Sequence, residues 1–300
     1  MPQTAIGSHG TAGAGRAVRL HRMLYRHGAG DGRAVFIPYD HGLEHGPRDF
    51  ADHPQAADPS YVLRLAVDAG ANGVVLHIGA AQQFFWEYAG EVPLILKING
   101  KTEIPPDDRA FSPATATVEE AVRLGADAVG YTLYVGSPRQ DEDLAQLGRV
   151  REDAQRFGMP LIVWSYPRGS AVAARGGRES FYAIDYAARA AAELGADFVK
   201  LNWPQARWRD ETPQPYREPR SDSEMLAALV RSAGRALVLV SGGAKTGDDE
   251  LLAKTALAAG AGATGMIVGR NLWQRERGEA LSLMARLRES LATGAGRANP

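Results

Sequence analysis

The chain has 300 residues, of which 45% are hydrophobic and 23% charged, and its formal net charge is −1. This composition is typical of a globular protein with a large core, and it argues against nucleic acid or an anionic membrane as the main partner. The absence of cysteine excludes disulfide and thiolate chemistry, and no apolar stretch reaches transmembrane length, so we expect a cytoplasmic protein.

One pattern recurs along the chain: a helix ends in a glycine-containing turn of small residues, and an apolar strand follows. The glycine suits the end of a helix, and a nearly all-apolar strand is typical of a parallel sheet covered on both faces. In chain order the pattern predicts strands at residues 34–40, 73–78, 94–99, 128–135, 161–166, 198–203, 236–242 and 265–271. Helices are predicted at residues 60–69, 116–124, 139–157, 180–194, 221–233, 248–259 and 278–291.

Eight buried strands that alternate with helices predict an α/β fold, the (β/α)8 TIM barrel. No linker-like stretch divides the repeats, so we predict one barrel domain over residues 21–295. The preceding residues 1–20, which begin with a run rich in Gly, Ala, Ser and Thr, are predicted to form a flexible N-terminal tail.

The long polar loops of the predicted barrel follow strands, whereas its helix-to-strand turns are short. These loops cover residues 41–57, 100–113, 167–180 and 204–220. Because active sites of such barrels lie at the carboxyl ends of the strands, we expect the chemistry to occur among these loops.

Lysine is rare in this chain, although lysine and arginine together number 34. The five lysines are Lys97, Lys101, Lys200, Lys245 and Lys254. A residue type avoided elsewhere is expected to remain where arginine cannot replace it, which means where a primary amine is needed. The alternative is that codon bias left a few lysines behind. However, only Lys254 has the position of an ordinary helix-surface lysine, and the others lie in or shortly after predicted strands.

Lys200 lies inside an apolar run of residues 198–203 that reads as a buried strand. A buried ammonium costs several kcal/mol unless it is paired or loses its proton. A desolvated lysine has a lowered pKa and becomes an amine nucleophile that can form a Schiff base. Lys200 is therefore our candidate nucleophile.

Strand alternation indicates which side chains accompany Lys200. Lys200 and Asn202 share one face of their strand, and Trp164 and Tyr166 share one face of the neighbouring strand. A Lys200 side chain that points into the barrel can meet Asp40 at the end of the first strand. We therefore expect Asp40, Tyr166 and Lys200 to converge on one cavity.

Five motifs together resemble the archaeal-type class I fructose-bisphosphate aldolases, a family of Schiff-base enzymes. Each motif is weak alone, but they occur in order within about residues 33–290. The motifs are YDHGLEHGP (39–47), WSYPRG (164–169), VKLN (199–202), SGGAKT (241–246) and VGRNLWQRE (268–276).

The resemblance implies roles for four residues of a (β/α)8 barrel. Lys200 would form the imine, Tyr166 would do acid–base work, Trp164 would line the site, and Asp40 would lie beside the lysine. The stretch 204–220 looks longer than the family leads us to expect, so no further acid–base carboxylate can be placed there.

Phosphate sites are expected in this barrel for a separate reason. Such barrels commonly hold phosphate between the loops after strands 7 and 8, where glycines allow close backbone approach and arginine offers a charged fork. The candidates there are Ser241, Gly242, Gly243, Gly269 and Arg270, and Arg168 is the candidate for a second phosphate. The alternative is that these glycines only make tight turns.

The histidines near the N-terminal end raise the alternative of a zinc site, because Asp40, His41, Glu44 and His45 lie close in sequence. However, HGLEHGP contains two glycines and a proline, so we predict a loop rather than a helix that presents two ligands. Structural hydrogen bonds are then expected for His41 and His45. We predict no metal and no cofactor.

The function implied by the resemblance is that of a lyase of glycolysis and gluconeogenesis. It would reversibly cleave fructose 1,6-bisphosphate to dihydroxyacetone phosphate and glyceraldehyde 3-phosphate, and it would assemble as a homo-oligomer such as a decamer. The alternatives are a transaldolase-like synthase of an aromatic-precursor pathway, a thiolase acting on a phosphorylated signalling compound, and a non-catalytic barrel that binds a sugar phosphate.

Overall fold

The computed structural model describes residues 13–295, and its strands close into a barrel in which neighbours in sequence are neighbours in space. All neighbouring strands are parallel, which confirms the predicted TIM barrel of one domain. The strands are β1 (Ala34–Tyr39), β2 (Gly73–His77), β3 (Leu94–Lys97), β4 (Ala128–Leu133), β5 (Leu161–Ser165), β6 (Phe198–Leu201), β7 (Leu237–Ser241) and β8 (Gly265–Ile267).

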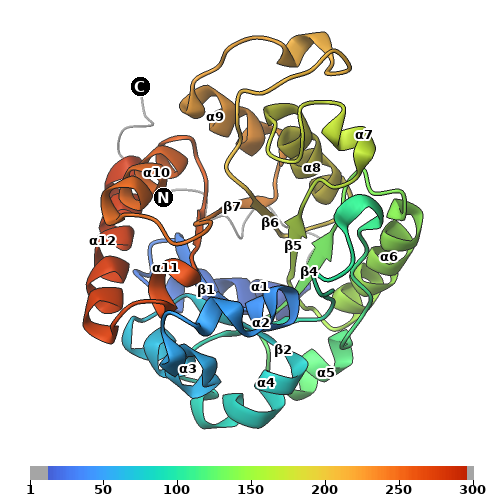
Figure 1. The fold of residues 1–300 in the computed structure, drawn as a ribbon. Coiled ribbons are helices and arrows are strands. Elements are labelled where there is room, and N and C mark those ends of the chain that lie inside the picture. Colours follow the sequence, from blue (N-terminus) through green and yellow to red (C-terminus); the bar gives the residue numbers. More distant parts are fainter. Residues whose placement is uncertain (1–12, 296–300) are drawn as a thin grey trace.

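Helices cover the outer side of the barrel, and shorter helices lie at its ends (Figure 1). They are α1 (Ala14–His21), α2 (His41–His45), α3 (Pro59–Asp68), α4 (Ile78–Phe84), α5 (Val118–Arg123), α6 (Gln140–Arg156), α7 (Ser170–Ala173), α8 (Phe181–Glu193), α9 (Asp222–Ser232), α10 (Asp248–Gly260), α11 (Arg270–Trp273) and α12 (Arg277–Ala295). Shorter 3-10 or π-helical segments are η2 (Arg22–Arg26), η3 (Gly46–Phe50), η4 (Pro54–Ala57), η5 (Phe85–Tyr88), η6 (Asp107–Arg109) and η7 (Gln214–Tyr216). Within residues 13–295, the helices are too short or too polar to cross a lipid bilayer.

The apolar side chains form two separate clusters because the strands are buried on both faces. The larger cluster lies between the strands and the surrounding helices. The smaller one fills the inside of the barrel, where the rings of Phe36 and Phe198 meet edge to face with centroids 5.9 Å apart. Trp164 belongs to this inner cluster and also lines the cavity at the carboxyl ends of the strands, so the barrel core supports that cavity from beneath.

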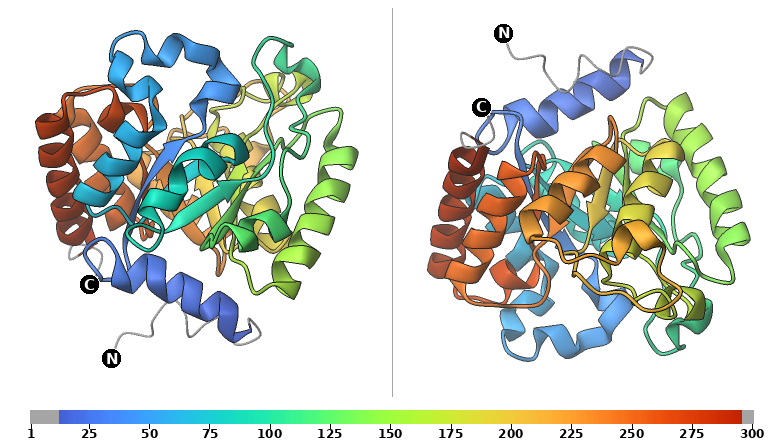
Figure 2. Two further views of the ribbon diagram at one scale, coloured as in Figure 1. Left: turned by 90° about the horizontal axis from the view of Figure 1, so that it is seen from below. Right: turned by 90° about the horizontal axis from the view of Figure 1, so that it is seen from above.

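The inner cluster is closed at one end by α1 and η2. Leu20, Met23 and Leu24, which are spaced as the apolar face of a helix, are all buried against the barrel interior. Figure 2 shows α1 lying across the end of the barrel opposite α2. Ion pairs between Arg16 and Asp197 and between Arg22 and Asp127 fasten it there.

The predicted flexible tail of residues 1–20 is therefore too long. Residues 1–12 lie outside the described residues, but residues 14–20 belong to α1. The glycine- and alanine-rich start of the segment masked the apolar spacing that begins at Leu20.

Two further local predictions are wrong. HGLEHGP is not a loop: residues 41–45 form the short helix α2, and Gly46 with a φ of 68° ends it before η3. Strand β8 ends at Ile267, four residues before the predicted end, because Arg270 already begins α11. Both errors lie where a strand passes into a helix within a few residues.

Candidate active site

A cavity of about 570 Å³ opens at the carboxyl ends of the strands. The loops after β1, β3, β5, β6, β7 and β8 contribute to its wall, as expected for a TIM barrel. All of the site residues predicted from the sequence line it, namely Asp40, Trp164, Tyr166, Arg168, Lys200, Ser241, Gly242, Gly243, Gly269 and Arg270. The structure thus brings together residues that are up to 230 positions apart in the chain.

Lys200 lies in the middle of the cavity floor. Its β6 position pairs with Trp164 of β5 and Leu239 of β7, and the residue is only 6% exposed. The ammonium nitrogen is 5.2 Å from the centre of the Trp164 ring and 5.5 Å from that of Tyr166. Burial lowers the pKa of Lys200 to about 8, although the carboxylates of Asp40 and Glu44 oppose the shift. A useful fraction of the free amine is therefore present near neutral pH.

Asp40 lines the same cavity as Lys200, as expected from the sequence, but forms no ion pair with it within 4 Å. The ion pairs within 4 Å that the structure records for it are with Lys97, at 3.8 Å, and His41, at 3.6 Å. Burial raises the pKa of Asp40, but Lys97, His41 and Lys200 outweigh that effect and the pKa is lowered. Asp40 therefore stays ionised and acts on Lys200 over a longer distance.

Lys97 and Glu44 are two site residues to which the sequence pattern assigned no catalytic role. Lys97 is fully buried under the cavity floor, and its ammonium nitrogen lies 3.7 Å from Glu44 and 5.2 Å from the Trp164 ring. A Cβ atom at Gly130 would come within 2.7 Å of that tryptophan and 3.2 Å of Lys97, so glycine makes this packing possible. The scarcity of lysine had already singled out Lys97 as one of four lysines in or shortly after strands, but it gave no partner for its charge.

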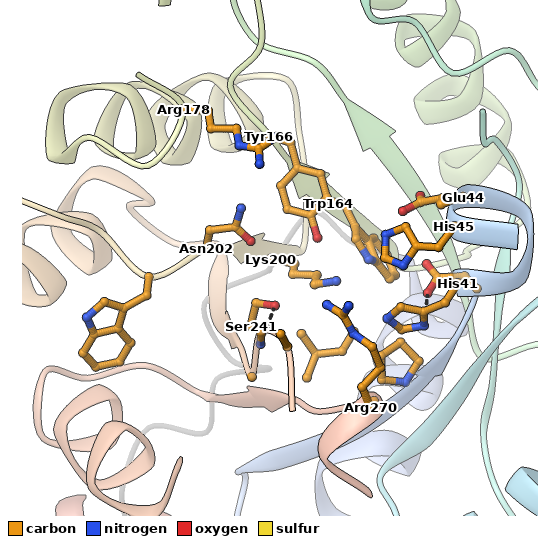
Figure 3. Close-up of a pocket in the computed structure, with 18 of the residues that line it drawn as sticks. His41, Glu44, His45, Trp164, Tyr166, Arg178, Lys200, Asn202, Ser241 and Arg270 are labelled. Carbon is orange, nitrogen blue, oxygen red and sulfur yellow. Dashed lines mark hydrogen bonds and ion pairs between the residues drawn. The ribbon is translucent and has the colours of Figure 1, made fainter. Parts of the chain in front are cut away.

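Tyr166 stands above Lys200 in the cavity. Figure 3 shows its hydroxyl directed toward the Lys200 amine. Burial, together with the negative charges of Glu44 and Asp40, raises the pKa of Tyr166 well above its ordinary value. The phenol is therefore a proton donor in the resting site.

One cationic region of the cavity lies where β7 and β8 end. Gly243 adopts a φ of 72°, and a Cβ atom at Gly269 would come within 2.9 Å of both His41 and the Pro38 carbonyl. The Nε of Arg270 is buried and makes no hydrogen bond within the described residues, while Nη1 lies 3.8 Å from Asp49. An arginine with free donor capacity, beside glycines that leave room for a ligand, forms a surface suited to an anion.

A second cationic region lies across the cavity. Lys101 and Arg168 contact Asp107 at 2.8 Å and 2.9 Å, and Arg178 lies 3.6 Å from the same carboxylate. Figure 3 shows Arg178 and Arg270 on opposite sides of Lys200. Sequence reasoning identified Arg168 but missed Arg178 and Asp107, because their meeting depends on how two loops approach each other.

The histidines of α2 differ in their bonding. His45 shares a hydrogen bond of 2.6 Å with Asp49, which confirms the structural role expected for it. The Nδ1 of His41 has no hydrogen-bond partner among the described residues, and burial lowers the pKa of His41 to about 4. Within residues 13–295, no three His, Asp or Glu side chains are grouped as ligands of one metal ion.

Lys254 is not the ordinary helix-surface lysine that its sequence position suggested. It lines the rim of the cavity, pairs with Glu250 at 2.6 Å and lies 5.6 Å from the centre of the Trp203 ring. No local sequence pattern indicated this position, because α10 meets the loop after β6 only in the folded barrel.

Comparison with known proteins gives a consistent result. Residues 34–275 match the model of the DeoC/LacD family of aldolases. The chain is 43% identical over 270 residues to the class 1 fructose-bisphosphate aldolase of Thermoproteus tenax, covering 90% of this chain and 93% of the relative. It is 36% identical over 249 residues to the enzyme of the same name from Halobacterium salinarum, with 82% and 86% covered.

Solved structures resemble the chain over most of its length. An archaeal fructose-1,6-bisphosphate aldolase, with its catalytic Lys covalently bound to the carbinolamine intermediate of the substrate, superimposes with a TM-score of 0.78. It is 42% identical, and the match covers 91% of this chain and 99% of that one. A fructose-bisphosphate aldolase from Slackia heliotrinireducens superimposes with a TM-score of 0.80 at 26% identity, covering 95% and 91%.

Proposed function

The chain belongs to the DeoC/LacD family of aldolases, and we propose that Lys200 is the residue that forms the imine with its substrate. The activity is that of a Schiff-base fructose-1,6-bisphosphate aldolase, a lyase that yields dihydroxyacetone phosphate and glyceraldehyde 3-phosphate. Each step of this reaction can be assigned to a side chain of the cavity.

The observation that carries the proposal is the position of Lys200 between two cationic regions. Its amine is buried with a pKa lowered to about 8, which gives a nucleophile at neutral pH. Arg270 lies on one side of it and Arg178 on the other, and Arg178 shares the Asp107 carboxylate with Arg168. A ketose with a phosphate at each end fits such an arrangement, because both phosphates meet cations while the C2 carbonyl lies over the amine.

Lys200 begins the reaction as the free amine and attacks C2 of the ketose. The C2 oxygen takes one proton from the Lys200 nitrogen to give the carbinolamine and a second from Tyr166, which is protonated in the resting site. The oxygen then leaves as water, which yields the protonated imine and the Tyr166 phenolate. The resulting phenolate takes the C4 hydroxyl proton as the C3–C4 bond breaks, and the bond's electrons move into the imine. Tyr166 then returns the proton to C3 of the enamine, and hydrolysis releases dihydroxyacetone phosphate and Lys200.

Three of the surrounding residues support this cycle. Asp40 and Glu44 supply negative charge that stabilises the positively charged imine, and their effect is strong because the site is buried. The Trp164 ring faces the Lys200 ammonium and forms part of the cavity wall. We assign phosphate binding to Ser241, Gly242, Gly243, Gly269 and Arg270 on one side, and to Arg168 on the other.

Replacement of Lys200 by arginine tests the assignment. Arginine keeps the positive charge but cannot serve as the amine nucleophile, because guanidinium stays protonated. With fructose 1,6-bisphosphate and borohydride, the wild type is expected to gain the mass of the reduced adduct and Lys200→Arg none. Activity is expected to fall by several orders of magnitude while circular dichroism shows a folded barrel.

Lys254→Arg is the matched control, since it removes another amine that lines the same cavity. This variant should be trapped as readily as the wild type. Adduct formation that persists in Lys200→Arg would contradict the assignment and move the nucleophile elsewhere, with Lys97 as the next candidate.

We also propose that the enzyme is a cytoplasmic homo-oligomer. Its substrate, a sugar carrying two phosphates, is a charged metabolite that the cell retains. The resemblance to aldolases that form large rings of barrels supports assembly, with a decamer as the form expected.

A further inference from the structure

Asp107 stands at the centre of the second cationic region. Its two carboxylate oxygens face Lys101 at 2.8 Å, Arg168 at 2.9 Å and Arg178 at 3.6 Å. Within residues 13–295, the structure records no other carboxylate within 4 Å of any of these three cations. One carboxylate therefore pairs with three cationic side chains, at the edge of a cavity that in the proposed function binds a phosphorylated sugar.

This mismatch of charge favours an anion larger than a carboxylate. A phosphate group carries a charge of roughly −1.5 to −2 at neutral pH and three strong acceptor oxygens, against one charge and two oxygens for Asp107. Burial raises the pKa of Asp107, but its contacts with Lys101 and Arg168 outweigh burial and the pKa is lowered. Asp107 is thus ionised at neutral pH, and it holds the cations that a phosphate would need.

The position of the cluster indicates which end of the substrate it faces. This step rests on the proposed function, in which C2 of the sugar lies at the Lys200 amine. The charge of Arg270 acts on Lys200, and Figure 3 shows Arg178 of the Asp107 cluster farther from the Lys200 amine than Arg270. The phosphate on C1 is close to C2 and suits the nearer arginine, so the phosphate on C6 is left for the more distant cluster.

The structure of its loop allows the Asp107 side chain to move away from the three cations. The base of the loop is fixed, since Asn99 pairs with Ala114 and the Gly100 amide donates to the Pro113 carbonyl at 3.2 Å. Asp107 itself lies on the short turn η6 near the middle of the loop, and its side chain is 40% exposed. Rotation of this short side chain toward solvent would free the cations without moving the base of the loop.

We propose that Asp107 is an internal competitor of the substrate's C6 phosphate. The carboxylate neutralises Arg168 and Lys101 in the empty site, gives way when fructose 1,6-bisphosphate binds, and returns as glyceraldehyde 3-phosphate leaves. It thereby limits the affinity for this phosphate and assists release of the aldehyde product. Fructose 1-phosphate carries no phosphate at C6 and leaves Asp107 in place.

The experiment compares two substrates in Asp107→Asn. The ratio of kcat/KM for fructose 1,6-bisphosphate to that for fructose 1-phosphate is expected to rise about tenfold, since a competing charged contact is removed. The inhibition constant of glyceraldehyde 3-phosphate is expected to fall by a similar factor. Asp108→Asn is the matched control, because it removes the same charge from the adjacent exposed residue, and its ratio should equal that of the wild type.

Arg168→Ala separates failure of this inference from failure of the phosphate assignment. If Arg168→Ala weakens the bisphosphate selectively and Asp107→Asn leaves the ratio unchanged or lowers it, Asp107 does not compete and the inference is overturned. If Arg168→Ala affects both substrates equally, the phosphate assignment itself fails. If the ratio rose equally in Asp108→Asn, the effect would come from the loss of one negative charge in general and not from Asp107 itself. That result would also overturn the inference.

Discussion

At the scale of single residues, the proposed reaction depends on the Lys200 amine losing its proton. With the pKa lowered from 10.5 to about 8, the fraction of free amine at pH 7 is roughly 300 times that of an ordinary lysine. This gain comes mainly from burial, and the carboxylates of Asp40 and Glu44 keep it from becoming larger. In the proposed mechanism, the two carboxylates limit the fraction of free amine but later stabilise the positively charged imine.

The pH dependence of imine formation reflects this balance. Because only the free amine attacks, the rate of borohydride trapping with limiting substrate is expected to rise about tenfold per pH unit below pH 8 and to level off above it. Single-turnover trapping read by intact mass between pH 6 and 9.5 measures this. A rate that is already constant from pH 6, or that still rises at pH 9.5, would contradict a lysine titrating near 8.

Arg270 gives a second residue-scale prediction. Arg270→Ala should weaken the binding of fructose 1,6-bisphosphate much more than that of unphosphorylated fructose, since a charge-assisted hydrogen bond contributes about 1.5–3 kcal/mol. Competition assays with each sugar as inhibitor measure the two losses. Arg286→Ala, which removes an arginine paired with Asp248 outside the cavity, serves as control. Equal losses for both sugars would remove Arg270 from the phosphate site.

At the scale of elements, α1 and η2 are expected to contribute to the stability of the barrel but not to catalysis, because they lie at the end opposite the cavity. Leu24 is fully buried at the end of the barrel opposite the loops that line the cavity. Leu24→Ala is therefore expected to lower the free energy of unfolding by about 2–5 kcal/mol. Thermal unfolding and steady-state kinetics should show a lower Tm with kcat nearly unchanged.

Val18→Ala is the control for this prediction, because Val18 lies on the adjoining helix α1 but is 56% exposed. A change within about 0.5 kcal/mol is expected for it. If Leu24→Ala were as mild as Val18→Ala, the helix would not close the barrel in solution.

The elements also show how far the sequence could predict the structure. The strands were recognisable because both faces of each are buried, which leaves an apolar run that ends at a turn. Helix α2 was not recognisable, since Gly42 within it and Gly46 and Pro47 directly after it favour a loop. Asp40, Tyr166 and Lys200 could be grouped from the sequence for two reasons. The carboxyl ends of parallel strands lie together in a barrel, and strand alternation indicates which side chains point into it.

Other parts of the site depend on contacts that the sequence does not encode locally. Asp107 meets Arg168 only because the loops after β3 and β5 approach each other, and their path is set by the closed barrel. Lys97 pairs with Asp40 because β3 places the Lys97 ammonium within 3.8 Å of that carboxylate, a contact that the sequence analysis did not expect. To predict such pairings, one must know the positions of the side chains as well as the order of the strands.

At the scale of the whole molecule, we expect several copies of the chain to assemble. Light scattering at micromolar protein should give a mass that is a multiple of the 32.1 kDa chain, with a decamer as the form expected. A mass equal to one chain would contradict the proposed assembly. Dilution into the nanomolar range, followed by the same measurement, tests how tightly the copies hold together.

The distribution of lysine has a practical consequence for chemical modification of the enzyme. Of the five lysines, Lys97 and Lys200 are buried, and the ammonium groups of Lys101, Lys245 and Lys254 are engaged with Asp107, the Gln274 carbonyl and Glu250. Reagents that couple to primary amines, such as succinimidyl esters or aldehyde-activated resins, therefore find few side chains on the outside of the barrel. Attachment to a support or a fluorophore is better directed to a cysteine introduced at an exposed position such as Val18, since the chain has no thiol of its own.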